Sequence, residues 1–301
     1  MLSELAPHDK DGNFVRDYDP SSVVSTHGPL SKEGRYRVYL GNPCPWCHRV
    51  YMALLLLKPE NVEVVRLVDD AERASKGGWV LPGEEGGVKD LYGVYKKYTN
   101  GEYGGRATAP LLVDLNNGEL VSNESNDILR LLQILGTTGV TMVPEGRRGE
   151  IEEANEWGYR LLQNGCYRCG FATTQGAYDD AAGDVLEGLR KLDKRLGESR
   201  FIVGDRVTEA DVKMYPWAER FDGAYTTIFK APGGGVGMWG NIDRWRGEMR
   251  RIKGMGDTVD VEDAVGSYYR QLFMLNPGGI QPRGEGGWEE GEEWEDVLCF
   301  V

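Results

Sequence analysis

The stretch NPCPWCHR, residues 42–49, constrains the fold more than any other part of the chain. An apolar and aromatic run at 35–41 precedes it and predicts a β-strand, and the run HRVYMALLLLK continues it as a helix. Cys44 is therefore expected at the N-terminus of that helix, with Pro45 in the first helical position. Unpaired N–H groups and the positive end of the helix dipole favour an anion there, so we expect a lowered pKa for the Cys44 thiol, which makes it a nucleophile.

The order of strand, Cys-x-x-Cys and helix is that of a thioredoxin-like redox site, with Cys47 as a possible second thiol. Two alternatives stay open: a pair of buried cysteines at an ordinary helix start, and half of a zinc site. A second such pair, Cys166 and Cys169, could complete a zinc site. The two pairs lie about 120 residues apart, and the second lacks a glycine-rich turn. We therefore expect no metal, with Cys169 and Cys299 as core residues.

Composition excludes several classes of protein. The 301 residues carry a formal charge of −13, so there is no surplus of basic residues to neutralise nucleic-acid phosphates. No run of 18 apolar residues exists, and the first residues hold acidic side chains without an apolar stretch, so we expect neither a membrane span nor a secretory signal. Five cysteines suit a reducing compartment. We expect a cytoplasmic protein.

The N-terminal half alternates strand and helix signals. A second strand is predicted at 61–70, a hairpin at 110–123 with Asn-Asn-Gly between two apolar runs, and a helix at 124–135. Residues 71–105 contain many glycines and lysines and are expected to form a long irregular connection. This order indicates a small α/β unit.

From about residue 147 the periodicity is helical only. One helix opens with TEAD, in which Thr208 and Asp211 are spaced as a capping box. The predicted fold class is α/β + all-α: a thioredoxin-like domain followed by an all-helical one. The predicted divisions are an N-terminal arm at 1–33, the α/β domain at 34–140, the helical domain at 148–284 and an acidic tail at 285–301.

Two further features match a redox site that binds a peptide-like thiol. Pro110 precedes a predicted strand, where thioredoxin-like folds place a cis proline, and the backbone of Ala109 could pair with a peptide. Glu124 and Ser125 open a predicted helix, where an acid and a hydroxyl can hold an ammonium and a carboxylate together. The alternative, that both only cap the helix, stays open.

With these features the chain resembles a glutathione transferase, and more narrowly the Xi class, the glutathionyl-hydroquinone reductases. The resemblance runs from about residue 35 to 284. Its motifs are CPWCHR, the Gly-Trp pair at 78–79, GRATAP, NES, NGCYRCGFATTQGAYD, TEAD, RFDGAYTTIFK, SYY and NPGGIQPRG. The segments GFATTQ and RFDGAY are far more specific than the thioredoxin-like elements.

The resemblance implies a reaction in which Cys44 attacks the sulfur of a glutathionyl-hydroquinone and forms a mixed disulfide with glutathione, which a second glutathione resolves. Glutathione is the implied co-substrate and a homodimer the implied assembly. The residues implied to hold glutathione are Trp79, Arg106, the Ala109 backbone, Glu124 and Ser125. Those implied to line the aromatic substrate site are Tyr167, Tyr225 and Tyr268.

The chain departs from the family's pattern at Cys47, where alanine is usual, and at Ser267, where a histidine is common. Cys47 puts a single-thiol mechanism in doubt. Other functions also stay open: an Omega-like thioltransferase or dehydroascorbate reductase with the same cysteine, and a non-catalytic module with a glutathione-transferase fold.

Overall fold

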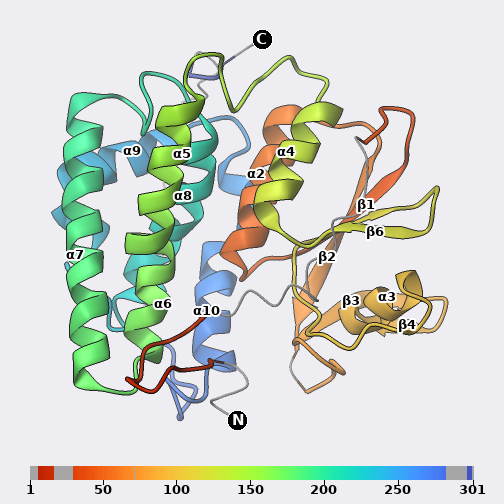
Figure 1. The fold of residues 1–301 in the computed structure, drawn as a ribbon, viewed down its shortest axis with the longest axis horizontal. Helices are drawn as coiled ribbons and strands as arrows, with labels where there is room; N and C mark the ends of the chain where they lie inside the picture. Colours follow the sequence, from red (N-terminus) through yellow and green to blue (C-terminus); the bar gives the residue numbers. More distant parts are fainter. Residues whose placement is uncertain (1–5, 17–29, 71, 283–296, 300–301) are drawn as a thin grey trace. The chain divides into compact units, whose positions relative to one another are not determined.

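The computed structural model describes residues 6–16, 30–70, 72–282 and 297–299 (Figure 1). Their contacts divide them into two compact units. The sheet unit comprises the described residues from 30 to 140 together with 258–260, and the helical unit comprises the rest. Within these residues, no helix combines the length and the apolar character that a membrane crossing requires.

The sheet unit contains six strands and three helices among its described residues. In chain order they are β1 (Tyr36–Gly41), α2 (Pro45–Leu57), β2 (Val62–Asp69), β3 (Trp79–Glu85), β4 (Val88–Asp90), α3 (Leu91–Tyr98), β5 (Leu111–Asp114), β6 (Glu119–Ser122) and α4 (Ser125–Leu135).

The strands form one sheet in the order β4-β3-β2-β1-β5-β6. Strands β1 and β2 are parallel, with Tyr36 opposite Val62, and every other pair is antiparallel. A parallel pair needs a crossover between its strands, and α2 provides it. Helices α2 and α4 lie side by side against the sheet (Figure 1). The core of the unit lies where they cover β1 and β5, whose apolar side chains are buried.

The prediction of an irregular connection at 71–105 is wrong, because β3, β4 and α3 lie within it. Gly86 and Gly87, with φ of 58° and 83°, join β3 to β4 as a two-residue hairpin loop, in which both residues need positive φ. The Asp90 side chain then caps α3 by accepting a hydrogen bond from the Gly93 N–H at 2.8 Å. Two of the glycines that suggested a loop therefore form the turn of a hairpin.

The helical unit contains longer helices. They are α5 (Arg148–Trp157), η2 (Gly158–Gln163), α6 (Asn164–Phe171), α7 (Gln175–Glu198), α8 (Glu209–Arg220), η3 (Phe221–Tyr225), η4 (Val236–Met238), α9 (Gly240–Arg250), η5 (Gly256–Thr258) and α10 (Val261–Gln271). The last residue of η5, Thr258, belongs by its contacts to the sheet unit.

Both η2 and η3 are π-helical, with η2 joining α5 to α6 and η3 extending α8. Helix α7 packs against α6 and α9, and α5 packs against α8 (Figure 1). Helix α8 is buried along its whole length and forms the centre of the unit. The predicted α/β + all-α fold class is thus confirmed.

The ends of the chain are partly described. Of the predicted arm, residues 6–16 form a small hairpin in which His8 pairs with Phe14. Of the predicted tail, Val297 and Cys299 are buried, and the Thr141 N–H donates to the Cys299 carbonyl at 2.9 Å. The tail's tryptophans, Trp288 and Trp294, lie outside the described residues.

The capping box at the start of α8 is confirmed, and its acid does more than cap. The fully buried Asp211 carboxylate accepts hydrogen bonds from the N–H groups of Thr208 and Ile202 and from the Trp245 indole, each at 2.9 Å. One carboxylate therefore satisfies donors from the helix start, the preceding loop and α9.

Replacing this acid should destabilise the helical unit strongly. Asp211→Ala would leave buried donors without acceptors, and we expect the free energy of unfolding to fall by about 2–4 kcal/mol, measured by urea denaturation at neutral pH. The matched control is Asp205→Ala, at an exposed acid in the preceding loop, which should change stability by less than about 0.5 kcal/mol. Equal stability of the two variants would contradict this prediction.

Candidate active site

The chain turns from β1 into α2 at Cys44. The Cys44 backbone is extended (φ −77°, ψ 117°). Cys44 is the N-cap of α2, and Pro45 is at the first helical position. The Cys44 N–H donates to the Gly41 carbonyl at 3.2 Å, and the Cys44 carbonyl accepts from the His48 N–H at 3.0 Å. The sulfur therefore takes the place that a Ser or Asp side chain occupies in an ordinary N-cap.

Two contacts of opposite effect surround the Cys44 sulfur. The Cys47 N–H points at it from 3.4 Å, which favours a negative charge on the sulfur. The Ala109 carbonyl oxygen lies 3.5 Å away and accepts a hydrogen bond from the neutral thiol. The helix start thus favours the thiolate while the carbonyl favours the thiol. Cys44 is partly exposed, whereas Cys47 is fully buried.

The side chains that follow the cysteines have their own partners. The buried His48 ring places Nε2 2.8 Å from the Thr258 hydroxyl. The Arg49 guanidinium stacks over the Trp46 ring at 4.2 Å and donates to the Ser125 hydroxyl at 3.4 Å. Thr258 was not anticipated as the partner of His48, because 210 residues separate the two in sequence.

The residues expected to hold glutathione come from different elements of the sheet unit. The Trp79 ring packs directly on Gly41, where an added Cβ would lie 2.2 Å from the indole. Glu124 is the N-cap of α4 but makes no capping hydrogen bond with its side chain, and Ser125 is buried as the first residue of that helix. Capping by the Glu124 carboxylate is therefore not the reason for an acid at this position.

The loop before β5 carries Arg106 and Ala109. The Ala109–Pro110 peptide bond is cis, as expected. Arg106 is exposed, and its carbonyl accepts from the Tyr103 hydroxyl at 2.7 Å. The Tyr103 ring stacks on Tyr95 with centroids 4.3 Å apart, and this packing positions the loop.

In the helical unit, three tyrosines distant in sequence meet at their hydroxyls. The Tyr268 hydroxyl lies 2.9 Å from that of Tyr167 and 3.3 Å from that of Tyr225. Burial is the largest cause that holds the pKa of Tyr225 and of Tyr268 well above the usual tyrosine value, so both stay protonated at neutral pH. We call these three residues the phenol cluster.

The π-helical segments place two members of the cluster. Tyr225 is the last residue of η3, and Tyr167 follows η2 by four residues. Phe229 packs against all three rings, with centroids 5.1 to 5.6 Å away. It approaches Gly170 so closely that a Cβ there would lie 2.2 Å from the ring. Phe229 belongs to the cluster's wall, and its place in the motif RFDGAYTTIFK was the only signal for it.

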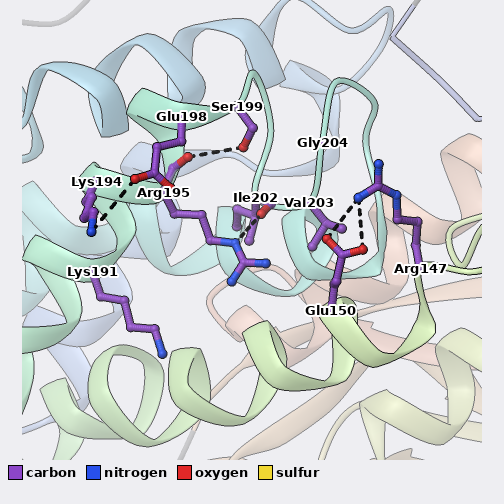
Figure 2. Close-up of a pocket in the computed structure, with 10 residues that line it drawn as sticks. All are labelled: Arg147, Glu150, Lys191, Lys194, Arg195, Glu198, Ser199, Ile202, Val203 and Gly204. Carbon is purple, nitrogen blue, oxygen red and sulfur yellow. Dashed lines mark hydrogen bonds and ion pairs between the residues drawn. The ribbon is translucent and has the colours of Figure 1, made fainter.

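A separate cavity of about 410 Å³ lies between α5, α7 and the loop after α7 (Figure 2). Arg147 pairs with Glu150 at 2.9 Å, and Lys194 lies 3.9 Å from Glu198. No residue predicted for catalysis or binding lines this cavity. Its other two cations, Lys191 and Arg195, share the Glu153 carboxylate at 3.2 and 2.8 Å, so each lining cation has a carboxylate partner.

The family is decided by two comparisons with known proteins. The glutathione S-transferase N-terminal domain matches residues 43–133, and the C-terminal domain matches residues 175–252. The chain is 32% identical to the glutathionyl-hydroquinone reductase YqjG of Escherichia coli, over 85% of this chain and 81% of the relative. The chain belongs to the glutathione transferase family. It is an enzyme of this family, and the resemblance to its glutathionyl-hydroquinone reductases is confirmed.

Further relatives agree with this. The glutathionyl-hydroquinone reductase PcpF of Sphingobium chlorophenolicum is 33% identical, over 91% of this chain and 90% of its own. An omega-like glutathione S-transferase of Schizosaccharomyces pombe is 30% identical, over 91% of this chain and 94% of its own.

Solved structures of such transferases also match the fold. The glutathione-bound structure of YqjG superposes with a TM-score of 0.78 at 30% identity, covering 94% of this chain and 92% of that one. Glutathione transferase Xi 1 of Trametes versicolor superposes with a TM-score of 0.77 at 30% identity, covering 87% of this chain and 96% of that one.

Iodoacetamide should distinguish Cys44 from the other four cysteines. Cys44 is partly exposed, whereas Cys47, Cys166, Cys169 and Cys299 are buried. Burial raises the pKa of the Cys169 thiol to about 12 and also raises the pKa of the Cys166 and Cys299 thiols. We expect peptide mass mapping of the native protein to find Cys44 alkylated first, and all five modified in urea. Native labelling of Cys47 at the rate of Cys44 would contradict the geometry.

Proposed function

We propose that the protein is a glutathione-dependent reductase of glutathionyl-hydroquinones that acts through the Cys44 thiolate and a Cys44–glutathione mixed disulfide. The phenol cluster is the observation that supports this substrate most specifically. The Tyr268 hydroxyl lies within hydrogen-bond reach of the Tyr167 and Tyr225 hydroxyls, and this group of phenols, backed by Phe229, suits an aromatic ring that carries hydroxyl groups. The names of the relatives YqjG and PcpF support the same activity.

The proposed reaction balances in two steps. In the first, a hydroxyl proton of the ring moves to the carbon that bears the sulfur, the Cys44 thiolate attacks the sulfur of the glutathionyl group, and the sulfur–carbon bond breaks with its electron pair moving onto the resulting carbonyl oxygen. The ring gains one proton and leaves as the hydroquinone, while Cys44 holds glutathione as a mixed disulfide. In the second, the thiolate of another glutathione attacks that disulfide, giving glutathione disulfide and the free Cys44 thiolate.

The two groups of residues have separate parts in this proposal. Trp79, Arg106, the Ala109 backbone, Glu124 and Ser125 hold glutathione. Glutathione binding by YqjG supports glutathione as the co-substrate here. The phenol cluster donates hydrogen bonds to the hydroquinone oxygen, on which negative charge develops as the ring departs. Donors aimed at a developing charge stabilise the transition state more than the bound substrate.

A second candidate function uses the same cysteine. The omega-like relative favours a thioltransferase or dehydroascorbate reductase, which would need Cys44 and the glutathione site but not the phenol cluster. We further propose a homodimer, which rests on the resemblance to the Xi class, and a cytoplasmic location, which rests on five cysteines that suit a reducing compartment.

Cys44 should be required for every turnover. Cys44→Ser keeps an N-cap of similar shape but replaces the thiolate with a hydroxyl, which is not a nucleophile at neutral pH. We expect loss of hydroquinone release from glutathionylated menadiol, by a factor of at least about a thousand, with an unchanged unfolding midpoint. Retention of turnover in this variant would overturn the proposed mechanism.

The matched control is the neighbouring cysteine. Cys47 is fully buried, so we expect it to take no part in the cycle. Cys47→Ala should keep glutathione-dependent turnover within about threefold of the wild type, because external glutathione resolves the mixed disulfide. Loss of most turnover would replace the single-thiol mechanism with one in which Cys47 is the resolving thiol.

The phenol cluster should separate the two reductase candidates. Tyr268→Phe removes the hydroxyl that lies between the other two. We expect turnover of a glutathionyl-hydroquinone to fall roughly five- to thirtyfold, the effect of about 1–2 kcal/mol. Reduction of glutathionylated mercaptoethanol, which has no aromatic ring, should be nearly unchanged.

A tyrosine outside the cluster provides the control. The Tyr178 hydroxyl donates to the Lys230 carbonyl at 2.9 Å, away from the other phenols, and Tyr178→Phe should leave both activities unchanged. Equal losses on both substrates in Tyr268→Phe would favour a role in the fold. An unchanged hydroquinone rate would favour the omega-like function.

A further inference from the structure

Residues 6–16 form a hairpin that lies against the helical unit. The turn is tight: Asp9 accepts hydrogen bonds from Asn13, and Gly12 has a φ of +86°. The Val15 N–H donates to the Pro7 carbonyl at 2.9 Å and closes the hairpin. Asp-Gly is a common hairpin turn, so the Asp11-Gly12 pair in DKDGN is a sequence signal for this hairpin.

The hairpin is fastened to the segment that ends α6. The Thr173 N–H donates to the Gly12 carbonyl at 3.0 Å, and the Thr174 hydroxyl donates to the Asp11 carbonyl at 2.8 Å. The His8 ring lies 2.6 Å from the Phe171 carbonyl oxygen. These are contacts to one short segment, 171–174, so the hairpin has a defined place on the helical unit.

Aromatic rings carry this attachment to the phenol cluster. Phe14 is buried and packs on Phe171 with ring centroids 5.2 Å apart. Phe171 in turn packs on Phe229, which contacts all three cluster tyrosines. Next to Phe14, the Arg16 guanidinium lies over the Tyr167 ring, 5.0 Å from its centroid. The hairpin thus brings a full positive charge to the face of a cluster tyrosine.

We propose that Arg16 is a specificity residue, which gives the phenol cluster a preference for aromatic ligands that carry an anionic oxygen. The proposal rests on the proposed function, because it assigns a ligand class to the same cluster. A guanidinium stays charged at every relevant pH and stacks on aromatic faces. A phenol donates to a hydroxyl and, more strongly, to an ionised oxygen, and a nearby cation adds to the preference for the ionised form.

The same charge would serve the proposed reaction. As the hydroquinone departs, negative charge moves onto its oxygen, and a cation near the donating phenols stabilises that charge together with their hydrogen bonds. Arg16 is exposed, so its interaction with an anion is weakened by water and salt, and a moderate effect is expected. Its contact with Tyr167 also orders that ring, which links the hairpin to the geometry of the cluster.

The test uses two ring ligands of similar size that differ in charge. The full-length protein is titrated, at mildly alkaline pH, with 4-nitrophenolate and with the neutral 4-nitroanisole, and binding is followed by their absorption. Arg16→Gln should weaken binding of 4-nitrophenolate by roughly three- to tenfold and leave binding of 4-nitroanisole unchanged. Arg16→Lys, which keeps the charge, should recover most of the affinity.

Two more variants separate charge from position. Lys10→Gln removes an exposed positive charge from the same hairpin and should bind both ligands as the wild type does. Phe14→Ala keeps Arg16 but removes the ring that anchors the hairpin, and should reproduce the loss of 4-nitrophenolate affinity. Equal losses on both ligands in Arg16→Gln, or no loss on either, would overturn the proposal.

The outcome is independent of turnover. If the wild type releases no hydroquinone from glutathionylated menadiol but Arg16 still discriminates the two ring ligands, the proposed reaction fails and the ligand preference stands. If hydroquinone is released and Arg16→Gln discriminates as the wild type does, the proposed function stands and the role of Arg16 is wrong.

Discussion

The junction between β1 and α2 is the constraint on which the sheet unit depends. Strand β1 lies between β2 and β5, and its last residue, Gly41, accepts the Cys44 N–H while Trp79 fills the space that a side chain would take. Four residues later the chain is a helix with a sulfur as its cap. A substitution with a Cβ at Gly41 would displace Trp79, and an apolar cap at Cys44 would leave a helix-start N–H without an acceptor.

The surroundings of the sulfur set a balance. The helix start and the Cys47 N–H favour the thiolate form of Cys44, and the Ala109 carbonyl favours the thiol form. The difference between these two effects determines the fraction of Cys44 that is thiolate at neutral pH. A thiol substrate whose backbone pairs with Ala109 would draw that carbonyl toward its own N–H. On the proposed function, binding of glutathione would therefore shift the balance toward the thiolate.

In the phenol cluster, the constraint is that polar hydroxyl groups are buried among apolar aromatic rings. Tyr225 and Tyr268 lie among Phe229 and other aromatic rings, where a hydroxyl without a hydrogen bond would be costly. Their two hydroxyls form a hydrogen bond with each other. The Tyr167–Tyr268 and Tyr225–Tyr268 hydrogen bonds use two of the three O–H donors, and each hydroxyl can also accept. The hairpin that carries Arg16 contacts the wall of this cluster, so a segment read from sequence only as a surface arm borders a candidate binding site.

The sequence by itself determined the local features: β1, the N-cap at Cys44, the Asn-Asn-Gly hairpin and the capping box of Thr208 and Asp211, because each depends on neighbours within a few residues. The sequence also contains the Gly86-Gly87 turn signal of the β3–β4 hairpin, although the pattern predicted an irregular connection there. Tertiary structure alone decided that Thr258 meets His48, that Tyr268 bridges Tyr167 and Tyr225, and that Arg16 lies over Tyr167. These contacts join residues 43 to 210 positions apart, and the packing of whole helices, which no local pattern encodes, brings them together.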